Sequence, residues 1–84
     1  MFYVYLLKSK KDKNFYTGST NDLERRMNEH NNGLVFSTKS RIPFELVYYE
    51  AYKSEDDARR RERKLKDYGQ AITALKSRLK ESLR

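Results

Sequence analysis

The chain contains no cysteine and no long apolar run. Without cysteine, disulfide scaffolds, thiolate zinc sites, iron–sulfur clusters and cysteine nucleophiles are excluded. No apolar stretch approaches the ~20 residues that a membrane-spanning helix needs. The first residues also lack the basic-then-apolar order of a signal peptide. We therefore expect an intracellular, cytoplasmic protein without a membrane partner.

Acidic side chains are also in short supply. The chain has 12 Asp and Glu against 19 Lys and Arg, which gives a formal net charge of +7. Residues 51–84 hold eleven basic and six acidic side chains, whereas residues 1–50 hold eight and six, so the excess lies toward the C-terminus. This balance predicts a polyanionic partner, either nucleic acid or an anionic surface.

The size and aromatic content predict one small folded domain over residues 1–84. A chain this short buries only about 60–65% of its unfolded surface, so we expect modest stability. Aromatic residues make up 13% of the chain, which favours a packed core over disorder.

Aromatic and β-branched runs predict three strands. The first, from Phe2 to Leu7, is apolar on both faces and is therefore expected at the centre of the sheet. A hairpin leads to a second strand at residues 15–19, and a third follows at residues 44–52. In the third strand, alternation places Leu46, Tyr48 and Glu50 on one face.

Three helices are expected between and after these strands. The first begins at Asn21, with Glu24 completing a capping box, and ends at Asn31-Asn32-Gly33. Ser54 caps a second helix that runs to Tyr68, where Gly69 is expected to stop it. A last helix covers residues 70–83. The order ββαβαα predicts an α+β fold, with a small three-stranded mixed or antiparallel sheet flanked by helices.

Two charged residues lie on stripes that should be apolar. Arg26 shares a helix face with Leu23 and His30, and either extends to the edge of that stripe or serves a functional site. Glu62 lies between Ala58 and Leu65 on the second helix. Because a buried carboxylate is costly unless it is paired or metal-bound, Glu62 either pairs with Arg59 or Arg63 or binds a ligand.

Three further polar residues can converge with this pair. Tyr5 and Tyr16 lie on adjacent strands, where each could equally be a core aromatic residue. His30, the only histidine, follows Arg26 by one helical turn and could be structural or catalytic. Together the five residues Tyr5, Tyr16, Arg26, His30 and Glu62 form a plausible site for chemistry on an anion.

The arrangement of these motifs resembles the GIY-YIG nuclease family. Tyr3-Val4-Tyr5 and Tyr16-Thr17-Gly18 resemble its paired tripeptides, and Arg26 and His30 follow at the family's spacing. Residues 58–66 resemble the helix that carries its metal-binding glutamate, here Glu62. The resemblance extends over nearly the whole chain.

The chain also departs from the family pattern. Tyr3 and Val4 stand where the first tripeptide has glycine and isoleucine, and Thr17 stands where the second has isoleucine. Ser19 occupies a position where some members have lysine, and no asparagine follows Asn32 to match a late asparagine of other members. These changes keep strand-forming residues and both motif tyrosines, so the resemblance implies the fold. The unmatched lysine and asparagine make the resemblance less direct for catalysis.

The resemblance implies a metal-dependent endonuclease that acts on DNA or another nucleic acid. Glu62 would bind Mg²⁺ or Mn²⁺, Tyr5 would activate water and Tyr16 would position it. Arg26 would neutralise transition-state charge, and His30 would carry a proton or support Tyr5. DNA repair is one compatible role, and a protein partner could supply specificity.

The basic residues outside this set are expected to contact the nucleic-acid backbone, although a charged helix face is often merely solvated. The candidates are Lys39, Arg41, Arg59, Arg63 and Lys76. Two other functions stay open: a non-catalytic nucleic-acid-binding module on the same fold, and a basic structural or ribosome-associated protein. The second explains the charge but not the positions of Arg26 and Glu62.

Overall fold

The computed structural model describes all residues, 1–84, and confirms the α+β order ββαβαα. The sheet has the order β2-β1-β3 and both pairings are antiparallel. The strands are β1 (Phe2–Ser9), β2 (Phe15–Thr20) and β3 (Phe44–Tyr52), and the helices are α1 (Leu23–Asn31), α2 (Glu55–Asp67) and α3 (Gly69–Arg78). A 3₁₀ turn, η1, covers Lys39–Arg41.

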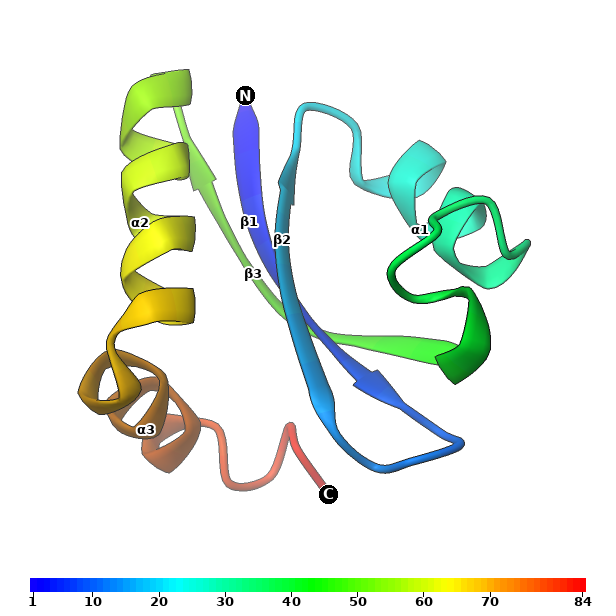
Figure 1. Cartoon of the computed structure of the whole chain (residues 1–84). Coiled ribbons are helices and arrows are strands. Elements are labelled where there is room, and N and C mark those ends of the chain that lie inside the picture. The colour runs from blue at the N-terminus through cyan, green and yellow to red at the C-terminus, as the bar shows by residue number, and fades with distance from the viewer.

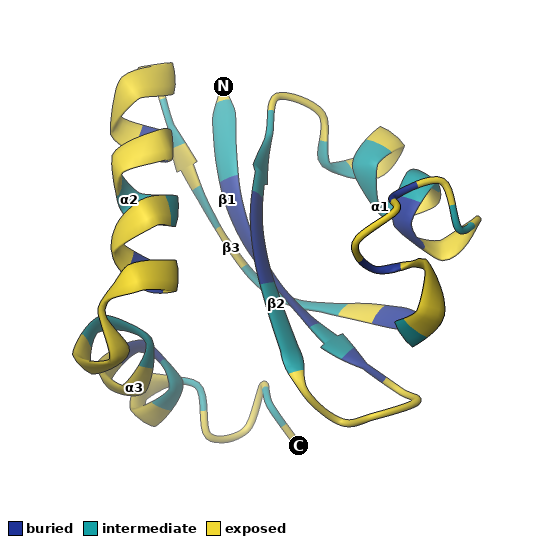
Figure 2. Cartoon of the chain, viewed as in Figure 1, coloured by how far each residue is buried: buried dark blue, intermediate teal, exposed yellow.

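The sheet is the middle of three layers. Helices α2 and α3 cover one face, whereas α1 and the loop that follows it cover the other (Figure 1). Strand β1 is central, and its residues Val4 to Leu7 are at most 2% exposed, as the two apolar faces of the sequence predict. Figure 2 shows this buried strand between the largely exposed outer surfaces of the helices.

Two apolar clusters hold the layers together, one on each face of β1. Val4 packs with Ala58, Leu65 and Leu75 under α2 and α3. On the other face, a second cluster is formed by Tyr5, Leu7 and Phe44, with residues of α1 against it. None of the helices combines the length and apolar character that crossing a bilayer would need.

Strand β3 differs from the simple alternation expected of it. A β-bulge lies where Leu6 pairs with Tyr48 and Leu7 pairs with Leu46. The extra residue, Val47, shifts the alternation, so Leu46 packs with the α1-side cluster while Tyr48 packs with the α2-side cluster. The expectation that Leu46 and Tyr48 share a face is therefore wrong.

Glu50 joins β3 to α2 through a compact polar cluster. Its carboxylate accepts hydrogen bonds from Tyr48, Tyr52 and the guanidinium of Arg61. Burial acts to raise the pKa of Glu50, but these three donors outweigh it and leave the pKa below its usual range. The ionised Glu50 carboxylate therefore has hydrogen-bond donors between the sheet and α2.

Helix boundaries account for the other differences. The cap of α1 is Asp22 rather than Asn21, because the Asp22 carboxylate accepts from the amide of Arg25 at 3.1 Å. Gly69 begins α3 rather than ending α2, since the extended backbone of Tyr68 separates the two helices. Helix α3 ends at Arg78 instead of continuing to residue 83, and the chain then turns so that the Leu83 carbonyl accepts from Lys8.

Candidate active site

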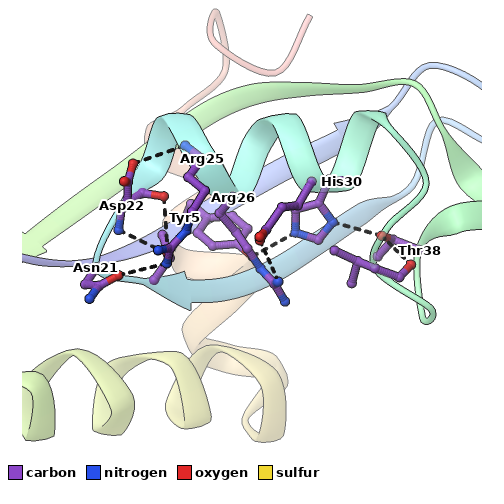
Figure 3. Close-up of polar contacts among 10 residues, drawn as sticks. Tyr5, Asn21, Asp22, Arg25, Arg26, His30 and Thr38 are labelled. Carbon is purple, nitrogen blue, oxygen red and sulfur yellow. Dashed lines mark hydrogen bonds and ion pairs between the residues drawn. The ribbon is translucent and has the colours of Figure 1, made fainter.

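Tyr5 lies at the centre of the site, buried on the face of β1 that α1 covers. Its hydroxyl is 2.9 Å from Nε2 of His30, and the two rings meet edge to face (Figure 3). Burial raises the pKa of Tyr5 to about 12, although the neighbouring guanidinium of Arg26 acts to lower it. In the free protein Tyr5 is therefore a neutral phenol at physiological pH.

Gly18 makes room for this phenol. It is paired with Tyr5 across the hairpin, and a Cβ atom at position 18 would lie 2.3 Å from the Tyr5 hydroxyl oxygen. No side chain fits at that distance. The glycine of the second tripeptide is needed here for space, because its φ is not in the left-handed region.

His30 is completely buried and is held at both ring nitrogens. Nε2 faces Tyr5, and Nδ1 lies 2.8 Å from the Thr38 hydroxyl, which is also buried. The Thr38 oxygen in turn lies 3.5 Å from the carbonyl of Val35. Burial, and next the charge of Arg26, hold the pKa of His30 below its usual range, so the imidazole is neutral at pH 7.

Arg26 extends from α1 toward the open side of the site and keeps 35% of its side chain exposed. Its guanidinium binds Glu29 at 3.0 Å. Burial acts to lower the pKa of Arg26, but the interactions with Glu29 and Tyr5 together outweigh it and raise the pKa, so the guanidinium stays charged. Arg26 was expected either to extend to the edge of the apolar stripe or to serve a functional site. It lies at that edge and still faces Tyr5 and His30.

Tyr16 lies beside the same imidazole from the neighbouring strand. Its ring centroid is 5.4 Å from that of His30, in an edge-to-face contact. Nζ of Lys66, from α2, lies 5.3 Å from the Tyr16 ring centroid. Tyr16 therefore connects the α1 side of the site to α2.

Glu62 approaches the site from α2, and its partners are not the arginines expected of a purely structural carboxylate. Ser19 donates to one carboxylate oxygen at 2.6 Å, and Lys66 binds the other at 2.9 Å. Neither Arg59 nor Arg63 pairs with it, so that expectation is wrong: Arg59 binds Glu55 one turn earlier. The negative charge of Glu62 also acts to raise the pKa of Tyr5, so the two groups lie within electrostatic reach.

A cleft of about 300 Å³ opens beside these residues, between α1 and α2. Arg25 and Arg26 line one wall, Arg59 lines the other, and Tyr3 lies between them on β1. Glu29 and Glu55 line the same walls as partners of two of these arginines. Arg26 and Arg59 thus have carboxylate partners in the cleft, whereas Arg25 donates to the side-chain oxygen of Asn21.

The other basic candidates are spread over the surface. Arg41 binds Asp12 of the β1–β2 turn at 2.6 Å, and this hydrogen bond lowers the pKa of Asp12 to about 2. Lys39 lies over the ring of Phe36 and Lys76 over that of Phe15. Arg63 is exposed on α2.

Three contacts of the site were missed by sequence reasoning. Thr38 fixes His30 from a loop eight residues later, and no local pattern signals that contact. Ser19 was considered only as a missing lysine, although it binds Glu62. Lys66 follows Glu62 by four residues on one helix, a spacing that does predict an ion pair.

Comparison with known proteins identifies the family. The GIY-YIG catalytic domain model matches residues 1–80. The chain belongs to the GIY-YIG family. This is a family of nuclease domains, and membership implies a nucleic-acid substrate.

The similar proteins are small members of this family. A UPF0213 protein of Clostridium perfringens is 48% identical over 63 residues, which are 74% of this chain and 67% of that protein. One from Staphylococcus saprophyticus is 40% identical over 67 residues, or 79% of this chain and 80% of its own. The solution NMR structure of a UPF0213 protein from Bacillus halodurans is 34% identical and covers 94% of this chain and 87% of that one, with a TM-score of 0.57.

Proposed function

We propose that this chain is a metal-dependent endonuclease that hydrolyses phosphodiester bonds in nucleic acid, with DNA as the first candidate. The observation that carries the proposal is the buried contact between Tyr5 and the neutral imidazole of His30, with the charged Arg26 beside both. Because the Tyr5 hydroxyl, the imidazole and the Thr38 hydroxyl form one continuous hydrogen-bonded chain, a proton can pass between Tyr5 and His30.

The donor set at Glu62 fits one hydrated divalent ion once Lys66 leaves the carboxylate oxygen that it binds. The chain holds no cluster of three or more His, Asp or Glu side chains, so a site formed wholly by protein ligands is not available. Glu62 offers one carboxylate beside the Ser19 hydroxyl, which suits Mg²⁺ or Mn²⁺ because Mg²⁺ commonly keeps several waters and one or two carboxylates. When bound there, the ion would supply charge stabilisation at the phosphate.

Proton transfer is assigned to Tyr5 and His30. The Tyr5 hydroxyl donates to Nε2 of neutral His30, while Nδ1–H donates to Thr38, whose own proton faces the Val35 carbonyl. As water attacks phosphorus, the P–O bond to the leaving oxygen breaks. The water proton passes to the Tyr5 oxygen, the original phenolic proton passes to His30, and the leaving oxygen takes its proton from solvent. This relay avoids a free phenolate, which a pKa of about 12 makes scarce at neutral pH.

Arg26 and Tyr16 are assigned to the phosphate. The planar guanidinium of Arg26 can pair with two phosphate oxygens once Glu29 releases it, and it neutralises charge as the transition state forms. Tyr16 positions the water or phosphate with its hydroxyl. The surface cations Lys39, Arg41, Arg59, Arg63 and Lys76 are proposed contacts of the nucleic-acid backbone, and a protein partner is a proposed source of site choice.

The test is cleavage of plasmid, branched DNA, single-stranded DNA and RNA, with Mg²⁺ or Mn²⁺ in low salt. Arg26→Ala and Glu62→Ala should each lose roughly 10²–10³-fold in rate while retaining binding. Arg60→Ala is the matched control, because Arg60 is exposed on α2 and pairs only with Asp57. It should cleave like the wild type.

The same experiment separates the second candidate function. If no substrate is cut, and all four proteins bind nucleic acid equally and in a salt-sensitive way, the active-site assignment fails. The non-catalytic binding module would then be the better account. The observation that favours it is that Glu62 already has a lysine partner.

A further inference from the structure

Two tyrosines form an aromatic pair on the sheet beside the cleft. Tyr3 of β1 and Tyr49 of β3 meet edge to face, with ring centroids 5.8 Å apart. Tyr49 is 51% exposed, and Tyr3 lines the cleft. No helix therefore covers this pair completely.

The pair differs from the two β3 tyrosines on the other face of the sheet. Tyr48 and Tyr52 donate their hydroxyls to Glu50 and pack against the cluster under α2. Tyr3 and Tyr49 have no such partner, and Tyr49 leaves half of a large aromatic surface in water. The half-exposed Tyr49 ring, in contact with a tyrosine that lines a cleft together with three arginines, suits a ligand that is both flat and anionic.

The register places this pair next to the reactive groups. Tyr49 is directly opposite Tyr5, and Tyr3 precedes Tyr5 by two residues on the same face. Two residues of a strand span roughly 7 Å, so the separation of Tyr3 and Tyr5 along β1 is about the length of one nucleotide. Arg26, which lines the cleft with Tyr3, also influences the pKa of Tyr5.

We propose that Tyr3 and Tyr49 are a stacking platform for an unpaired nucleobase next to the phosphate held at Arg26. This inference rests on the proposed function for the identity of that phosphate. Bases inside a duplex are stacked on one another and cannot lie on a protein ring, whereas unpaired bases readily do so. The substrate is therefore a single strand, or a junction or flap with an unpaired nucleotide at the cleavage site.

The experiment measures binding without cleavage. A 12-nucleotide oligothymidylate with one 2-aminopurine, its RNA equivalent and a blunt DNA hairpin are titrated with protein in EDTA. Tyr49→Ala should weaken binding of the single strands roughly 10- to 100-fold, because stacking contributes about 1–3 kcal/mol per base. It should leave hairpin binding within twofold, and it should abolish the quenching of 2-aminopurine.

Two variants serve as controls. Tyr49→Phe keeps the ring and should bind like the wild type. Tyr68→Ala removes an aromatic residue that is 64% exposed at the α2–α3 junction, and it should have no effect on quenching. Circular dichroism verifies that each variant is folded.

The outcomes separate this inference from the proposed function. Single-strand affinity and quenching unchanged in a folded Tyr49→Ala protein overturn the platform, even if the wild type cleaves nucleic acid. Loss of both in Tyr49→Ala supports the platform, even if no cleavage is found. A preference for the DNA or the RNA strand identifies which polymer supplies the base.

Discussion

At the scale of single residues, Gly18 shows how a missing side chain shapes the site. Its Cα lies against the Tyr5 hydroxyl, so Gly18→Ala must push the phenol out of its place. We expect the variant to lose about 1–3 kcal/mol of unfolding free energy and at least tenfold in cleavage rate. Urea unfolding and cleavage kinetics measure both effects. Thr17→Ala, next along β2, is the control and should retain the Tyr5–His30 contact.

His30 gives the chain a defined response to acid. Its folded-state pKa is lowered by burial, whereas the unfolded chain takes up a proton near pH 6.5. The unfolded state therefore binds more protons below pH 6.5, and the free energy of unfolding falls as the pH decreases from there toward the folded-state value. Well above pH 6.5, where neither state binds the proton, this contribution does not change.

Urea unfolding at pH 7.5, 6.5 and 5.5 measures that response. The slope attributable to His30 should be at most about 1.4 kcal/mol per pH unit. Because His30 is the only histidine, His30→Gln should remove this slope. An equal slope in the variant would show that carboxylates cause it instead.

Sequence reasoning predicted which candidate residues lie together better than it predicted their partners. The periods of strands and helices predict which residues share one side of the sheet, and they place Tyr5, Tyr16, Arg26 and His30 together. The contact of Thr38 with His30 could not be predicted, since it depends on how the connection between α1 and β3 folds back. The partner of Glu62 also depends on side-chain rotamers, and these bring Lys66 rather than a neighbouring arginine to its carboxylate.

At the scale of elements, Asn31 fastens the end of α1 to the start of β3. Its side chain donates to the Phe44 carbonyl at 3.1 Å and accepts from the Phe44 amide at 2.7 Å. Asn31→Ala should lower the unfolding free energy by about 1–2 kcal/mol, since two hydrogen bonds are lost. Hydrogen exchange should also accelerate in α1.

The control for this prediction is Asn28→Ala, which changes an exposed asparagine one turn earlier. Both variants gain the same helix propensity, so the difference between them isolates the contact with β3. Equal stability of the two proteins would contradict the role given to Asn31. Because α1 also carries Arg26 and His30, the Asn31 variant should cleave more slowly than the control.

The elements themselves were largely predictable and their ends were not. All three strands and all three helices follow from hydrophobic periodicity. Asn21 and Asp22 are both good caps, so only the backbone conformation distinguishes them. The β-bulge at Val47 and the early end of α3 arise from contacts with β1, which no local pattern encodes.

At the scale of the whole molecule, divalent metal should stabilise the fold. A ligand that binds only the native state adds about 1.4 kcal/mol at ten times its dissociation constant. For a domain this small, that corresponds to roughly 6–11 °C in melting temperature. Thermal unfolding with and without Mg²⁺ should show this increase in the wild type.

Glu62→Gln should remove the increase, because it removes the carboxylate charge. Lys66→Met should enlarge it, since Lys66 otherwise occupies one oxygen of Glu62. An identical response in all three proteins would place the metal elsewhere. These measurements need no nucleic acid, so they test the metal site independently of cleavage.

Because Arg26 is already paired with Glu29, a phosphate that binds Arg26 replaces one anion with another. A phosphate that takes the guanidinium frees Glu29, and Glu55 is freed in the same way if Arg59 is engaged. Each freed carboxylate then attracts a cation from solution, which offsets one of the cations released from the nucleic acid. The logarithmic salt slope of binding should therefore be smaller than the number of phosphates contacted, so a count of contacts from that slope would underestimate the interface.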